Sequence, residues 1–160
     1  MSILGVILAG GQARRMDGID KCRLKIGDNT ILDIVVNCLS LQLETIVLNA
    51  NGDPERFSDL EIDVIPDTIQ GYAGPLAGIL SGMRFAEKNG FTSILTVASD
   101  TPFFPLNLLT KLLDEGSKEN SLISIAATKQ NNKLMAKLPE LSKERTVINY
   151  QNCNNKKMTI

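Results

Sequence analysis

The stretch that decides the fold is Ile3-Leu4-Gly5-Val6-Ile7-Leu8-Ala9-Gly10-Gly11, near the amino terminus. Its first six residues form a short, continuous apolar run, which is typical of a strand buried on both faces. The paired glycines that follow can adopt positive φ and let backbone N–H groups approach an anion closely. The stretch predicts a buried strand that leads into a glycine-rich loop.

Working outward from this strand, apolar runs alternate with helical patterns. Further strands are predicted at residues 45–48, 63–65, 94–98 and 122–127. Apolar residues at helical spacing predict a first helix, carrying Ile31, Ile34, Val35, Cys38 and Leu39, with Thr30 and Asp33 as a capping box. A second helix is expected to place Leu76, Ile79, Leu80 and Met83 on one face, and a third to span 105–115. The alternation predicts an α/β, Rossmann-like three-layer αβα sandwich with a mostly parallel sheet.

The predicted strands end in polar or glycine-rich loops. Gly10-Gly11, Asn49, Asp67 and Asp100 each follow or close a strand. In open α/β sheets the ligand crevice lies outside the carboxyl ends of the strands. The four loops are therefore expected to converge on one edge of the sheet.

The chain of 160 residues suits a single domain. The regular pattern covers residues 1–128. Residues 129–160 are polar and rich in asparagine, with only Val147-Ile148 hinting at another strand. They are expected to form a divergent or shortened, partly disordered C-terminal part of the same domain.

Composition excludes several classes of function. Seventeen basic and eighteen acidic residues nearly cancel, which argues against a protein that coats nucleic acid or an anionic membrane. The absence of histidine excludes Ser-His and Cys-His nucleophiles and histidine zinc sites. Three cysteines without a C-x-x-C pattern fit free thiols in a reducing cytoplasm, and no apolar run is long enough to span a bilayer.

The segment after the glycine pair is dense in cations, with Arg14, Arg15, Lys21, Arg23 and Lys25. Arginine can hold phosphate oxygens in a bidentate fork, and lysine supplies a point charge. The alternative is a tight turn followed by a solvated basic loop, and the arginines favour phosphate binding. The Walker A and G-x-G-x-x-G patterns are both absent.

The other candidate residues each carry two interpretations. Asp100, followed by Thr-Pro, fits either a Mg²⁺ ligand or a carboxylate that caps local amides; its expected place beside the glycine loop favours the metal. Asp67 and Asn49 fit either turn chemistry or contacts to a nucleoside. The 74–78 segment opens a helix whose start could face an anion, or whose glycines could allow close packing.

Together these residues resemble the molybdenum cofactor guanylyltransferase family, within the nucleotidyltransferases of glycosyltransferase-A-like fold. The family pattern is roughly L-A-G-G-x-x-x-R-M-G-G-x-D-K, and this chain reads Leu8-Ala9-Gly10-Gly11-Gln12-Ala13-Arg14-Arg15-Met16-Asp17-Gly18-Ile19-Asp20-Lys21. The likeness continues at 47–51, 64–67, 74–79 and 99–102. It departs at Asp17, where the family has glycine, and in the C-terminal part, which lacks the family's His-Pro element.

The resemblance implies roles for individual residues. Leu8, Ala9, Gly10, Gly11 and Lys21 would bind the nucleotide. Asn49 and Asp67 would contact the nucleoside, and Asp100 would bind the triphosphate and Mg²⁺. Arg15, Lys21 and Asp100 would act in catalysis, and the helix start near Gly78 would help to seat the acceptor.

The implied reaction is the attack of the terminal phosphate of molybdopterin on the α-phosphate of GTP, with release of pyrophosphate. The implied partners are GTP, molybdopterin and, transiently, other enzymes of the molybdenum cofactor pathway. Two alternatives stay open: a truncated relative that binds nucleotide without catalysis, and a nucleotidyltransferase that uses another phosphorylated acceptor.

Overall fold

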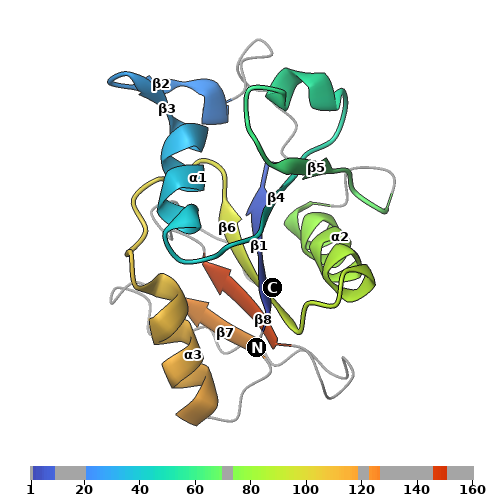
Figure 1. Cartoon of the computed structure of the whole chain (residues 1–160), viewed down its shortest axis with the longest axis vertical. Coiled ribbons are helices and arrows are strands. Elements are labelled where there is room, and N and C mark those ends of the chain that lie inside the picture. Colours follow the sequence, from blue (N-terminus) through green and yellow to red (C-terminus); the bar gives the residue numbers. More distant parts are fainter. Residues whose placement is uncertain (1, 10–20, 70–73, 119–122, 127–145, 151–160) are drawn as a thin grey trace.

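The computed structural model describes residues 2–9, 21–69, 74–118, 123–126 and 146–150 (Figure 1). One six-stranded sheet has the order β5-β4-β1-β6-β8-β7, and every neighbouring pair in it is parallel. Its strands are β1 (Ile3–Leu8), β4 (Ile46–Asn49), β5 (Asp63–Ile65), β6 (Ser93–Ala98), β7 (Ile123–Ala126) and β8 (Thr146–Tyr150). A separate antiparallel hairpin joins β2 (Lys25–Ile26) to β3 (Asn29–Thr30).

Helices cover both faces of the sheet. Helices α1 (Ile31–Ser40) and α3 (Leu108–Lys118) lie on one face, and α2 (Pro75–Lys88) lies on the other (Figure 1). Two short 3-10 turns, η1 (Lys21–Arg23) and η2 (Pro54–Phe57), flank the end of the sheet where β4 finishes. The predicted three-layer sandwich with a parallel sheet is confirmed.

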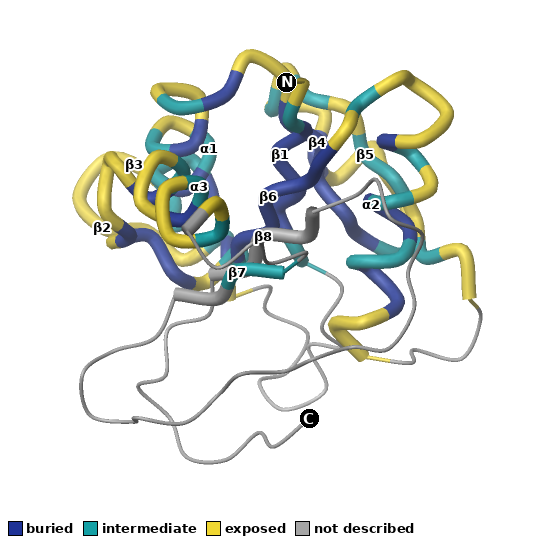
Figure 2. The backbone as a smooth tube through the Cα atoms, turned by 90° about the horizontal axis from the view of Figure 1, so that it is seen from below, coloured by how far each residue is buried: buried dark blue, intermediate teal, exposed yellow. Residues whose placement is uncertain are grey.

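The strands of the sheet centre send alternate side chains into two cores. Ile7, Leu48 and Leu95 pack with residues of α1 and α3, whereas Val6 and Val47 pack towards α2. Figure 2 shows β1, β4 and β6 as the buried middle of the molecule, with exposed residues on the outer helices. The continuous apolar runs read from the sequence are explained by this burial on both faces.

Helix α1 begins where the sequence predicts. The Thr30 hydroxyl accepts from the Asp33 amide at 3.1 Å, and the Asp33 carboxylate accepts from the Thr30 amide at 2.8 Å, so the capping box is present. The buried stripe is centred on Leu32, Val35 and Leu39. The predicted face missed Leu32, although Cys38 does pack at the edge of the core as expected.

Helix α2 packs Ile79 and Met83 of the predicted face against the core, but the residues that it buries completely differ from the prediction. Its fully buried residues are small, namely Ala77, Gly78, Ser81, Gly82 and Ala86. Leu76, expected on the apolar face, is 50% exposed. Small side chains let the helix lie close to the sheet, and hydrophobic periodicity does not register glycine or serine.

The C-terminal strand β8 contains the Val147-Ile148 run, and it lies between β6 and β7. The third helix begins at Leu108 rather than Pro105, with the Leu108 amide bonded to the Pro105 carbonyl at 3.0 Å. Among the described residues no helix has the length and apolarity needed to cross a membrane.

Candidate functional site

The carboxyl ends of four strands form one row across the sheet. Leu8 of β1 pairs with Asn49 of β4 on one side and with Ala98 of β6 on the other, and Asn49 pairs with Ile65 of β5. The chain winds outward in opposite directions on the two sides of β1. Such a switch point is where open α/β sheets bind ligands. The expected convergence of strand ends is confirmed.

Leu8 and Ala9 fix the entrance to the glycine-rich loop. The Ala9 amide donates to the Asn49 carbonyl at 2.8 Å, and the Ser99 amide donates to the Leu8 carbonyl at 3.1 Å. The loop therefore starts between the ends of β4 and β6. Gly10, Gly11 and Arg15 lie outside the described residues, so their roles stay predictions.

Asp67 is held by the amides of two asparagines. Asn49 Nδ2 donates to Asp67 Oδ1 at 3.0 Å and to the Ile65 carbonyl at 3.2 Å. Asn51 Nδ2 donates to Asp67 Oδ2 at 2.7 Å, and the Asp67 amide donates back to Asn51 Oδ1 at 2.8 Å. Asn49 is 1% exposed and Asp67 is half-buried. These hydrogen bonds give the Asp67 carboxylate a defined orientation beside the row of strand ends.

Gly78 supports this network from helix α2. A Cβ added at Gly78 would overlap Asn49 Oδ1 and would lie 3.0 Å from both Asn49 Cγ and Leu8 Cδ2. The absence of a side chain thus lets α2 lie directly against the strand ends. This arrangement fits the close-packing interpretation of the 74–78 segment, and the substrate-binding role of Gly78 stays a prediction.

Ser81, one turn further along α2, ties the helix to the residue after Asp67. Its hydroxyl accepts from the Thr68 amide at 2.8 Å and donates to the Ala77 carbonyl at 2.9 Å. The chain that leaves β5 is therefore anchored on both sides of the Asp67 side chain.

Asp100 lies two residues beyond the end of β6, in a turn, and is exposed. Within the described part of the chain its carboxylate accepts one long hydrogen bond, from the Thr101 hydroxyl at 3.4 Å. Among the described residues, the Asp100 carboxylate therefore caps no backbone amide, which was the alternative to a metal ligand. A carboxylate with no closer partner among the described residues fits Mg²⁺, which binds one or two carboxylates together with water and substrate oxygens. The described residues contain no larger cluster of acidic or thiol ligands, which a structural metal would need.

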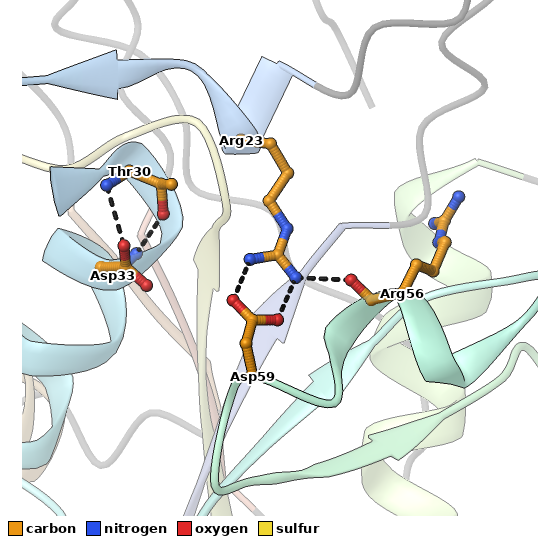
Figure 3. Close-up of polar contacts among 5 residues, drawn as sticks. All are labelled: Arg23, Thr30, Asp33, Arg56 and Asp59. Carbon is orange, nitrogen blue, oxygen red and sulfur yellow. Dashed lines mark hydrogen bonds and ion pairs between the residues drawn. The ribbon is translucent and has the colours of Figure 1, made fainter.

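Lys21 begins η1 and is exposed, while the neighbouring Cys22 is buried in the core. Arg23, which the sequence groups with the phosphate-binding cations, is engaged elsewhere (Figure 3). Its guanidinium donates to both Asp59 oxygens at 2.5 and 2.6 Å and to the Arg56 carbonyl at 2.6 Å. Arg23 therefore fastens η1, which begins with Lys21, to the chain that follows β4.

The hydrogen bonds from Arg23 lower the pKa of the Asp59 carboxyl below its ordinary value of 3.8, and the same bonds raise the pKa of Arg23. Asp59 is 58% exposed, so water and salt screen the pair. A carboxylate whose folded pKa is lowered stabilises the fold above its unfolded pKa, and this contribution is lost as the pH falls through the folded value.

We expect Asp59→Ala to lower the free energy of unfolding by no more than about 1 kcal/mol at neutral pH, because the pair is exposed. The loss should shrink in high salt, and it should also shrink as the pH falls through the lowered pKa of the folded-state carboxyl. Urea unfolding at several pH values and salt concentrations measures it, with exposed Lys25→Ala as the control. A loss that ignores both salt and pH would contradict an ionic origin.

Three features of the site were missed from the sequence. Asn51 carries a weak signal, since a polar residue two positions beyond Asn49 lies on the same side of an extended chain. Ser81 looks like an ordinary polar helix residue, and Arg23 and Asp59 are separated by 36 positions. Only the tertiary structure reveals these two anchors.

Comparison with known proteins agrees with this geometry. The family described as "MobA-like NTP transferase domain" matches residues 5–147. The chain is 43% identical over 127 residues to "Molybdenum cofactor guanylyltransferase" of Mesorhizobium japonicum, covering 79% of this chain and 61% of the relative. The protein of the same name from a Bradyrhizobium species is 41% identical over 129 residues, with the same coverage.

A solved structure named "Molybdopterin-guanine dinucleotide biosynthesis protein A", from Archaeoglobus fulgidus, superposes with a TM-score of 0.56 at 27% identity. The match covers 73% of this chain and 56% of that one. The chain spans about three fifths of the length of the curated relatives that it matches.

Proposed function

Because the chain belongs to the family of MobA-like NTP transferase domains, we propose that it transfers GMP from GTP to molybdopterin and releases pyrophosphate. The relatives that match most of the chain carry the name of this activity. The observation that carries the proposal is the row of strand ends, which brings Asn49, Asp67 and Asp100 to one edge of the sheet around the start of the glycine-rich loop.

In the proposed reaction the terminal phosphate of molybdopterin attacks the α-phosphate of GTP, and the bond from that phosphorus to the bridging oxygen of the β-phosphate breaks. Phosphoryl and nucleotidyl transfers depend on alignment and on the neutralisation of charge more than on an acid–base pair. A site without histidine is therefore sufficient for this chemistry.

The chain's residues divide this work between the two halves of the nucleotide. Gly10, Gly11 and the entrance residues Leu8 and Ala9 would hold the phosphates and part of the guanosine through backbone groups. Asn49 and Asp67 would contact the nucleoside from the β4–β5 side. Their fixed amide–carboxylate pairing at 3.0 Å gives the ligand a prearranged partner.

Charged groups would act on the triphosphate. Lys21 and Arg15 would neutralise the triphosphate as cations. Asp100 would hold Mg²⁺, which when bound polarises phosphate oxygens and aligns the leaving group. The exposed Asp100 carboxylate, with its single long hydrogen bond among the described residues, is free to take a metal ligand role.

The decisive experiment incubates the full chain with Mg²⁺ and GTP, CTP or ATP, with and without molybdopterin, and follows pyrophosphate. We expect pyrophosphate only when GTP and molybdopterin are both present. Release with CTP but not GTP would contradict the nucleotide assignment. GTP binding without pyrophosphate release in the presence of molybdopterin would contradict the transfer reaction.

A further inference from the structure

Asn51 makes a closed pair of hydrogen bonds with one neighbour, Asp67. Its Nδ2 donates to the carboxylate at 2.7 Å, and its Oδ1 accepts from the backbone amide of the same residue at 2.8 Å. No nucleotide role is implied for Asn51 itself by the resemblance described above. One side chain thus holds both the backbone and the side chain of Asp67.

We propose that Asn51 is a positioning residue, which fixes the Asp67 carboxylate in the orientation that receives the nucleoside half of the nucleotide. The proposal rests on the proposed function, because it assumes that Asp67 contacts a nucleotide. It adds a residue whose effect reaches the ligand only through Asp67.

The carboxylate plane of Asp67 is fixed because its two oxygens have different donors. Asn49 Nδ2 binds Oδ1 at 3.0 Å and Asn51 Nδ2 binds Oδ2 at 2.7 Å. Rotation about the side-chain torsions would break one or both bonds, and hydrogen bonds to a charged acceptor are stronger than neutral ones. Each oxygen keeps a further lone pair, so the carboxylate can still accept a hydrogen bond from a ligand.

The two asparagines contribute unequally to this arrangement. Asn49 is buried and also bonds the Ile65 carbonyl, so it belongs to the end of the sheet. Asn51 is half-buried and sits just before Gly52, whose φ of 91° turns the chain away from the row. Among the hydrogen bonds of the described residues, those of the Asn51 side chain go to Asp67 alone. This makes it the residue that can be changed with the least disturbance to the sheet.

Ser81 provides a matched control, because it anchors the adjacent residue without touching the carboxylate. Its hydroxyl accepts from the Thr68 amide at 2.8 Å. Ser81→Ala therefore loosens the same stretch of chain and leaves both bonds to the Asp67 carboxylate in place. A purely structural effect on this stretch would be shared by both variants.

The experiment measures the dissociation constants of GTP and of inorganic tripolyphosphate for the wild-type chain, Asn51→Ala, Asn51→Asp and Ser81→Ala. We expect Asn51→Ala to weaken GTP by about tenfold, with tripolyphosphate unchanged, since only the nucleoside half has lost its partner. Asn51→Asp keeps the shape and the acceptor for the Asp67 amide but faces Oδ2 with a like charge. It should weaken GTP at least as much. Under turnover the KM for GTP should rise while kcat changes little.

In Ser81→Ala the ratio of the two dissociation constants should match that of the wild-type chain. The inference is overturned if both Asn51 variants bind GTP as tightly as wild type. It is also overturned if they weaken GTP and tripolyphosphate equally, which is the mark of general disruption. A wild-type chain that binds tripolyphosphate but not GTP would instead overturn the proposed function.

Discussion

Replacing Asp100 with alanine is expected to lower the rate of pyrophosphate release by at least about a hundredfold, because it removes the proposed ligand of the Mg²⁺ that would neutralise the triphosphate. Asp100 is exposed and accepts one hydrogen bond, of 3.4 Å, from the described residues. Its removal should therefore change the free energy of unfolding by less than about 0.5 kcal/mol. Pyrophosphate release and a thermal melt on the same preparation separate the two effects.

Asp114→Ala is the matched control for Asp100, since it removes an exposed carboxylate from the distant helix α3. It should leave the rate unchanged. Chelation of Mg²⁺ should lower the rate of the wild-type chain as Asp100→Ala does. Full activity in Asp100→Ala would show that this carboxylate holds no metal essential to the reaction.

Gly78→Ala is expected to lower both the stability and the affinity for GTP. The new methyl group would overlap Asn49 Oδ1, so either the buried amide or helix α2 must move. Overpacking costs about 1–3 kcal/mol, and a disturbed buried hydrogen bond costs about 1–3 more. The helix preference for alanine returns only about 1 kcal/mol. The net loss should be about 1–5 kcal/mol, which lowers the melting temperature by at least roughly 2 °C.

Gly82→Ala separates packing from binding. Its added Cβ would lie 2.8 Å from Val6 Cγ2, so it also overpacks the contact of α2 with the sheet, but its three nearest atoms all belong to Val6, in the middle of β1. We expect a loss of stability in both variants and a loss of GTP affinity in Gly78→Ala alone. Equal GTP affinity in the two would mean that Asn49 does not contribute to binding.

The architecture could be predicted because the signals for it are local. The run at 3–8 and the capping box of Thr30 and Asp33 each depend on neighbouring residues, and both appear as expected. The common edge of the strand ends follows from parallel pairing. The sequence alone could therefore place Asn49, Asp67 and Asp100 in one row.

The connections within the site could not be predicted because they depend on tertiary contact. Helix α2 meets the strand ends through Gly78. Glycine has no side chain, so a pattern of apolar residues gives no sign of this contact. In the sequence, Arg23 looks like a phosphate ligand beside Lys21. Only the folded structure shows that it pairs with Asp59, which follows η2. The loop at 10–20 lies outside the described residues, so its part in the site stays a prediction.

The position of β8 also sets the order in which the molecule can be assembled during synthesis. The strands that carry the row, β1, β4, β5 and β6, are all complete by residue 98, so the ribosome delivers them first. Until residues 146–150 emerge, β6 has one free edge and β7 has no partner in the sheet. A free strand edge is a template for pairing with another chain. The edge of β6 is thus open to pairing with another chain after the strands of the row have been synthesised, and the arrival of β8 covers it.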